Sequence, residues 1–210
     1  MTCRVVVLIS GRGSNLRAIV EAGLPIEIAA VVSNRPQAAG LDYARARGIP
    51  AIALDHTSSP DRATFDTQLA GEIERFHPDL VVLAGYMRIL SPAFIARFEG
   101  RLLNIHPSLL PMFPGLDTHT RALAEGVKVH GCTVHFVTDK LDHGPIIIQA
   151  AVPVRADDTP DTLAARVLAQ EHRIYPLAIR WFAEGRLVNN HGRVNLKGDP
   201  TSQSVLANGG

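Results

Sequence analysis

The chain has 210 residues, of which 46% are hydrophobic and 20% charged, and its formal net charge is +1. A chain of this length hides roughly 70% of its unfolded surface, which is enough for one hydrophobic core. The near-zero charge excludes a generic attraction to nucleic acid, and no apolar run reaches the roughly 20 residues that span a bilayer. The N-terminus lacks a signal-peptide pattern, and Cys3 and Cys132 alone cannot make a disulfide framework. These observations predict a globular cytoplasmic protein.

The first hundred residues alternate short apolar runs with helical patterns. The runs at 5–9, 28–32, 51–54 and 80–84 are continuous, as is typical of strands buried on both faces. The segments between them have helical spacing, and the third such helix is expected to begin at Ser59 as its N-cap. Strands alternating with helices predict a parallel sheet whose ligands bind outside the carboxyl ends of the strands.

The second half is less regular. A strand is expected at 102–106, then a proline-rich loop, and then two strands at 129–137 and 146–152. A long helix follows, which Pro176 should kink or split, then a hairpin at 189–195 and a frayed tail from Gly198. We expect an α/β, Rossmann-like three-layer fold whose parallel N-terminal half continues into a mixed C-terminal sheet. One domain should cover 1–197, with halves at 1–100 and 101–197, and 198–210 should be a flexible tail.

A glycine-rich loop, GRGSN at 11–15, follows the first strand. Free backbone N–H groups and a helix N-terminus bind phosphate at such a position, and Ser14 is expected both to cap the helix and to contact the anion. A dinucleotide motif would need a glycine at Leu16 and an acid after the second strand, where Ser33-Asn34-Arg35 stands. The Gly-Lys-Ser/Thr of a Walker loop is absent. The loop therefore favours a mononucleotide phosphate over NAD; the alternatives are an NADP site with Arg35 as the phosphate reader, or a structural turn without a ligand.

Asn104 and His106 lie two residues apart at the end of a predicted strand, so their side chains share a face. An amide beside an imidazole suits acyl transfer, because both donate hydrogen bonds to a developing oxyanion. A carboxylate from Asp142 would favour the protonated imidazole and orient it. The sequence has no Gly-x-Ser-x-Gly elbow, which favours direct attack of one substrate on another. The alternative is a capped strand end and an ordinary turn aspartate.

The remaining histidines carry weaker signals. His130 and His135 lie five apart on one expected strand and face opposite sides, so with Cys132 they make a poor zinc site. His135 shares a face with Thr133, and this pair is expected to support the cleft of His106.

Four motifs together resemble the folate-dependent formyltransferases: SGRGSNL at 10–16, LAGYMRIL at 83–90, LNIHPSLLP at 103–111 and DHGP at 142–145. The glycine loop is similar to that of the branch that acts on glycinamide ribonucleotide. The resemblance covers residues 4–187, and His143 departs from it, since the family often has a small residue there.

The resemblance implies formyl transfer from 10-formyltetrahydrofolate, as co-substrate, to glycinamide ribonucleotide in purine biosynthesis, without metal or NAD. It implies that Asn104, His106 and Asp142 are catalytic. It implies ribonucleotide contacts from the glycine loop and the long helix: Gly11, Arg12, Gly13, Ser14, Asn15, Gln170 and Glu171. It implies folate contacts from three loops and the strand end: Arg62, Met87, Arg88, Ile89, Leu90, Asn104, Thr138, Asp139, Lys140, Leu141 and Asp142. Without the resemblance, residues 87–90 would be interpreted as core packing and Arg62 as a solvated helix start.

Several alternatives stay open at this stage. Within enzymes they are a formyltetrahydrofolate hydrolase and formyltransferases acting on Met-tRNA or on amino sugars. The first would carry an extra N-terminal domain, and the tRNA enzyme an extra C-terminal domain and a basic surface. A non-catalytic nucleotide-binding module would explain the glycine loop alone. We expect small-molecule substrates, no nucleic-acid or membrane partner, and a monomer or weak homodimer.

Overall fold

The computed structural model describes residues 2–198 and 203–207. The chain divides into two compact units, residues 1–104 and 105–210, which are described in turn. Within the described ranges, no helix is both long enough and apolar enough to cross a membrane.

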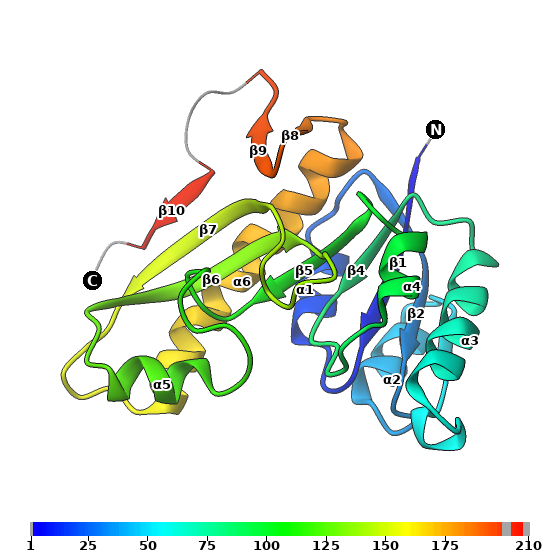
Figure 1. The fold of residues 1–210 in the computed structure, drawn as a ribbon, viewed down its shortest axis with the longest axis horizontal. Helices are drawn as coiled ribbons and strands as arrows, with labels where there is room; N and C mark the ends of the chain where they lie inside the picture. The colour runs from blue at the N-terminus through cyan, green and yellow to red at the C-terminus, as the bar shows by residue number, and fades with distance from the viewer. Residues whose placement is uncertain (1, 199–202, 208–210) are drawn as a thin grey trace. The chain divides into compact units, whose positions relative to one another are not determined.

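The first unit is built on a parallel sheet (Figure 1). Its central strand β1 pairs with β2 on one side and with β4 on the other, and β2 pairs with β3. β4 pairs with the beginning of β5, so the strand order is β3-β2-β1-β4-β5. The side chains of β1 from Val5 to Ile9 and of all of β4 are buried, which confirms the prediction from continuous apolar runs. The strands are β1 Cys3–Ile9, β2 Ile26–Ser33, β3 Ala51–Ala53, β4 Leu80–Leu83 and β5 Leu102–His106.

Helices cover both faces of this sheet. The crossovers that contain α1 and α2 run toward β3, whereas those that contain α3 and α4 run toward β5. Because such crossovers are right-handed, the two pairs lie on opposite faces. Contacts of α1 with α2 and of α3 with α4 agree with this arrangement (Figure 1). The helices are α1 Ser14–Glu21, α2 Ala39–Ala46, the 3₁₀ helix η1 His56–Ser58, α3 Arg62–Glu74 and α4 Pro92–Arg97.

Two expected helix caps are wrong. Ser59 does not cap α3; the cap is Asp61, whose carboxylate accepts the Thr64 N–H at 2.8 Å. Ser14 does not cap α1 either, because the cap position is Gly13, in the left-handed region at φ 74°, and Ser14 is already helical. The Ser14 hydroxyl is therefore not needed to complete the end of its own helix.

The second unit contains the strand order β10-β7-β6 and a separate hairpin (Figure 1). β6 and β7 are antiparallel, and β10 runs parallel to β7, which confirms the predicted mixed sheet. The hairpin of β8 and β9 is also confirmed, with the Gly192 N–H donated to Asn189 Oδ1 at 3.0 Å. The elements are α5 Thr118–Ala124, β6 Val129–Phe136, β7 Ile146–Pro153, α6 Pro160–Ala183, β8 Leu187–Asn190, β9 Arg193–Leu196 and β10 Ser204–Leu206.

α6 is a single helix of 24 residues that contains Pro176, so of the two expected outcomes, a kink or a split, the split is wrong. Proline in a helix interior costs about 3 kcal/mol. Pro176 is itself buried, and α6 contacts β6, β7 and α5, so the burial of its apolar face outweighs the missing hydrogen bond.

The expectation of a frayed tail from Gly198 is wrong for residues 203–207. β10 adds a strand to the outer edge of β7, with Gln149 N–H donated to Gln203 O at 3.1 Å and Ala207 N–H to Ala151 O at 3.0 Å. The remaining tail positions, 199–202 and 208–210, lie outside the described residues.

Candidate functional site

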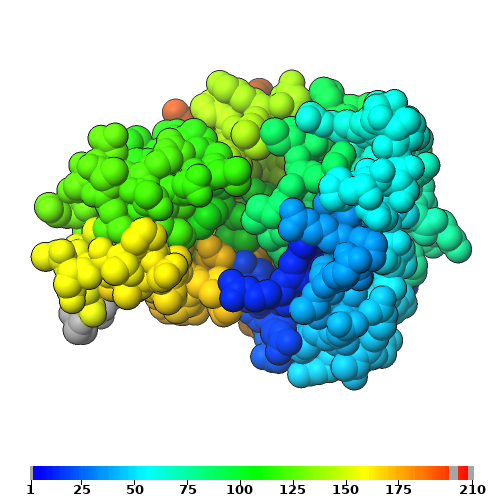
Figure 2. Space-filling model, turned by 90° about the horizontal axis from the view of Figure 1, so that it is seen from below, coloured from blue at the N-terminus to red at the C-terminus, as the bar shows by residue number. Residues whose placement is uncertain are grey.

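The glycine loop leaves β1 and enters α1, as predicted. Gly13 is buried at φ 74°, and a Cβ on it would lie 3.0 Å from the Gly40 Cα at the beginning of α2. The Gly40 N–H donates to Gly11 O at 3.1 Å, so the loop is held against the second helix start. Gly11 and Arg12 are exposed, and Figure 2 shows residues near the start of the chain, in dark blue, at the surface. The loop therefore presents exposed backbone at a helix N-terminus, the arrangement that binds phosphate.

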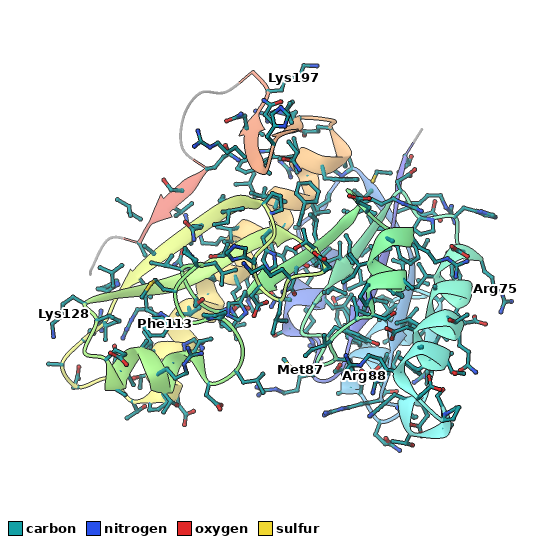
Figure 3. All side chains as sticks on the ribbon, viewed as in Figure 1. Arg75, Met87, Arg88, Phe113, Lys128 and Lys197 are labelled. Atoms are coloured by element: carbon teal, nitrogen blue, oxygen red, sulfur yellow. The ribbon has the colours of Figure 1, made fainter. Side chains whose placement is uncertain are left out.

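The segment after β4 alternates between buried and exposed side chains. Tyr86 and Leu90 are buried, whereas Met87 is 60% and Ile89 54% exposed. Arg88 is half-buried and lies over the Phe65 ring, 4.8 Å from its centroid. Met87 and Arg88 lie next to each other on this loop in Figure 3. Exposed large apolar side chains on a loop at the carboxyl end of a parallel strand are typical of a ligand site, so plain core packing does not explain this segment.

Asn104 and His106 are on β5, whose bounds agree with the prediction. His106 is 6% exposed, and Asn104 is half-buried. The His106 Nε2 lies 3.0 Å from the carbonyl oxygen of Phe113, in the loop before α5 (Figure 3). A carbonyl only accepts, so Nε2 is the nitrogen that donates this hydrogen bond, and Nδ1 is left to face the neighbouring carboxylate.

Asp142 lies beside that second nitrogen. Its Oδ2 is 3.5 Å from His106 Nδ1 and accepts the Gly115 N–H at 2.9 Å. Both side chains are only 8% exposed, so water screens the pair weakly. Asp142 is a non-glycine residue in the left-handed region, at φ 50°, a strained conformation that clusters at functional sites. The predicted carboxylate–imidazole pair is therefore present in the structure.

Three further histidines around this pair are held in the neutral form. Burial lowers the pKa of His135, where the nearby Asp142 carboxylate acts in the opposite direction. Burial and the neighbouring His119 lower the pKa of His130 to about 4, and burial lowers that of His119. Positive charge is thus disfavoured on the imidazoles of His119, His130 and His135. A register shift between Val134 and His135 interrupts the strand alternation that was used to place His135.

Thr133 supports the loop after His106. Its buried hydroxyl donates to Ser108 O at 2.7 Å and accepts from Leu110 N–H at 3.0 Å and from Gln149 Nε2 at 2.9 Å. Three bonds from one side chain hold the chain where it leaves β5.

The remaining predicted residues fall into two groups. Glu171 of α6 is buried, and together with burial its carboxylate raises the pKa of the Cys132 thiol. Gln170 is half-buried and accepts from Arg173 at 2.8 Å. The others have exposed or half-exposed side chains: Arg62 at the first position of α3, and Thr138, Asp139, Lys140 and Leu141 on the loop before Asp142. Among the described residues, no three His, Cys, Asp or Glu side chains are grouped to hold a metal ion.

The sequence matches the family model described as Formyl transferase over residues 3–179. The chain belongs to the formyl transferase family. It is 53% identical to phosphoribosylglycinamide formyltransferase of Escherichia coli over 198 residues, covering 92% of this chain and 93% of that protein. It is 46% identical over 196 residues to the human trifunctional purine biosynthetic protein adenosine-3, of which it covers 19%. Its structure resembles glycinamide ribonucleotide transformylase 1 from Symbiobacterium toebii, with a TM-score of 0.91 and 52% identity over 93% of this chain and 94% of that one.

Two contacts of this formyl transferase escaped the sequence prediction, because backbone groups make them. The Phe113 carbonyl orients His106, and the Gly115 N–H orients Asp142. Phe113 has a φ of 53°, so the turn aims its carbonyl at the imidazole in a strained conformation. The Pro114-Gly115 dipeptide marks this turn in the sequence, although it does not say which group the turn will contact.

Proposed function

We propose that this formyl transferase moves the formyl group of 10-formyltetrahydrofolate to the amine of glycinamide ribonucleotide, giving formylglycinamide ribonucleotide and tetrahydrofolate. The observation that carries the proposal is the His106–Asp142 pair, with Nε2 held by a backbone carbonyl and with Asn104 on the same strand. The identity to the E. coli enzyme over nearly its whole length supports the substrate pair.

In the proposed mechanism the neutral amine attacks the formyl carbon, and a carbon–nitrogen bond forms. The carbonyl oxygen becomes an oxyanion, which accepts hydrogen bonds from the Asn104 amide and from the protonated Nδ1 of His106. Asp142 stabilises that imidazolium and carries the amine proton toward the folate nitrogen N10. The bond from the formyl carbon to N10 then breaks, and N10 leaves with the proton. No covalent enzyme intermediate forms.

The binding roles are part of the proposal. The glycine loop, with Gly11, Arg12, Gly13, Ser14 and Asn15, receives the ribonucleotide phosphate through backbone N–H groups. Glu171 and Gln170 contact the ribonucleotide as well. The exposed Met87 and Ile89, their neighbours Arg88 and Leu90, and the loop 138–142 hold the folate, and Arg62 lies near its glutamate tail.

The decisive assay is the release of tetrahydrofolate with and without glycinamide ribonucleotide. We expect release to depend on the ribonucleotide. Equal release in its absence would identify a hydrolase and contradict the proposal. In thermal-shift measurements the ribonucleotide and tetrahydrofolate should each raise the melting temperature, whereas NAD should not.

His106→Ala tests the catalytic assignment. Loss of one donor to the oxyanion costs about a hundredfold or more in turnover, and we expect a fall of at least that size in kcat. A variant that melts like the wild type and retains near-full turnover would refute the assignment.

Asp142→Asn keeps an acceptor for the Gly115 N–H but removes the charge beside Nδ1. We expect kcat to fall far more than ribonucleotide binding weakens. Asp157→Asn, an exposed carboxylate of the same unit, is the matched control and should retain its kcat. An effect of Asp142→Asn on ribonucleotide binding alone would contradict the role given to Asp142.

Three further points belong to the same proposal. The enzyme functions in the cytoplasm as a monomer or weak homodimer, with no nucleic-acid or membrane partner. It needs neither metal nor NAD. Residues 1–197 act as one formyltransferase domain.

A further inference from the structure

Ser33-Asn34-Arg35 lies at the carboxyl end of β2, which ends at Ser33, where dinucleotide-binding proteins place an acid for the ribose. The function proposed above does not use it. Asn34 is only 1% exposed, so its side chain points into the protein rather than toward a ligand. Its own carbonyl oxygen accepts a hydrogen bond from His56 Nδ1 at 2.8 Å, which holds the backbone at this residue.

The Asn34 amide contacts Ser10, the last residue before the glycine loop. The buried Ser10 hydroxyl donates its single proton to Asn34 Oδ1 at 2.5 Å. The Ser10 Oγ in turn accepts the Met87 N–H at 2.8 Å, and the Ser10 N–H donates to Gly85 O at 3.1 Å. Since a hydroxyl has one proton, its donation to Asn34 leaves a lone pair of Ser10 for Met87.

The segment that receives this bond is held at both ends. At its far end the Ser91 N–H donates to Oδ2 of the buried Asp66 at 2.6 Å. Between the two anchors, Met87 and Ile89 project outward with more than half of each side chain exposed. Exposed apolar side chains on a backbone fixed at both ends make a preorganised contact surface for a flat, largely apolar ligand.

We propose that Asn34 is a positioning residue for the co-substrate: acting through the Ser10 hydroxyl, it sets the backbone of Met87 and so the surface that Met87 and Ile89 present to the folate. The inference rests on the proposed function, because that function identifies the ligand of this segment as a folate. Asn34 itself touches neither substrate.

The first test compares Asn34→Ala with Ser33→Ala. Without its acceptor the Ser10 hydroxyl is free to rotate, and the Met87 N–H loses a fixed partner. We expect the KM for 10-formyltetrahydrofolate to rise about fivefold to tenfold, equivalent to one buried hydrogen bond, with kcat within about threefold of wild type. Ser33 is the matched control, since it is equally buried and, among the described residues, its hydroxyl bonds to the backbone of Arg35 alone. Ser33→Ala should leave the folate KM unchanged.

A second measurement is independent of turnover. The Kd of tetrahydrofolate, measured by calorimetry, should rise by the same factor in Asn34→Ala. Ser10→Ala should raise the Kd of tetrahydrofolate by a similar factor. The Kd of the double variant should not exceed the larger of the two single-variant Kd values, because the two residues act as one unit. If Asn34→Ala does not fold, Asn34→Asp retains the acceptor oxygen and should keep the folate KM within about threefold of wild type.

Two results would overturn the inference. One is an unchanged folate KM and Kd in folded Asn34→Ala. The other is an equal rise in the KM of both substrates that Ser33→Ala reproduces, which would show a general loss of structure. Wild-type protein that fails to bind tetrahydrofolate would instead refute the proposed function, so the two failures are distinguishable.

Discussion

Replacing Thr133 by valine removes one hydroxyl and changes the side-chain volume little. That hydroxyl is fully buried and has three partners, the Ser108 carbonyl, the Leu110 N–H and the Gln149 side chain. Gln149 keeps a second bond, to Leu110 O at 2.8 Å, so valine leaves two backbone groups unsatisfied. Each unsatisfied buried group costs about 1–3 kcal/mol, which gives a total of about 4 kcal/mol. For a chain of this size, that lowers the melting temperature by roughly 10 °C.

Urea denaturation of Thr133→Val measures this loss directly, and Thr118→Val is its control. Thr118 is also buried, but within the described part of the chain its hydroxyl makes one bond, to Pro107 O at 2.7 Å. We expect Thr118→Val to cost about half as much. A loss of less than about 1 kcal/mol for Thr133→Val, or a loss no larger than that of the control, would refute the reasoning from unsatisfied partners.

The other predictions concern three glycines and a histidine. Gly13→Ala places a Cβ 3.0 Å from Gly40 Cα at a φ of 74°, so it should lower stability by about 1–2 kcal/mol and raise the KM for the ribonucleotide; an unchanged KM would contradict the phosphate role. In Gly144→Ala the Cβ would lie 1.8 Å from Phe136 O, so the loop that carries Asp142 must shift and kcat should fall. The Cβ of Gly71→Ala in α3 meets no atom within 4 Å, so this control should raise the melting temperature. The pKa of His130 is about 4 in the folded protein against 6.5 for an ordinary histidine, so the unfolded state binds more protons than the folded state between these pH values. The free energy of unfolding should therefore fall as the pH drops from 6.5 to 4. In urea titrations at several pH values, His130→Gln should make this fall smaller.

The strands were predictable because burial on both faces leaves a strong local pattern. β5 was located correctly, at 102–106, since a glycine turn at Gly100 precedes it and Pro107 ends it. The start of α3 was misplaced, because Ser59 and Asp61 are both good N-caps. Only the geometry selects Asp61, the residue whose carboxylate reaches a free N–H.

The candidate site was predictable in part. Side chains that differ from their neighbours in chemistry, such as Asn104 and His106, are visible in the sequence. The pairing of His106 with Asp142 has no local pattern, because these residues are distant in the chain, and it was expected from the resemblance. The sequence marks the turn at Pro114-Gly115 but not the contact made by Phe113, since every residue has a carbonyl and only the fold decides where it points.

β10 has a consequence for how the protein behaves in concentrated solution. An uncovered strand edge is a template on which other chains add strands, and β7 is rich in Ile, Val and Ala. The bonds from 203–207 occupy the outer N–H of Gln149 and the outer carbonyl of Ala151, and the Gln203 side chain also donates to Ile147 O at 2.7 Å. β10 therefore covers this edge and disfavours self-association through it. A variant truncated after Gly198 should aggregate more readily.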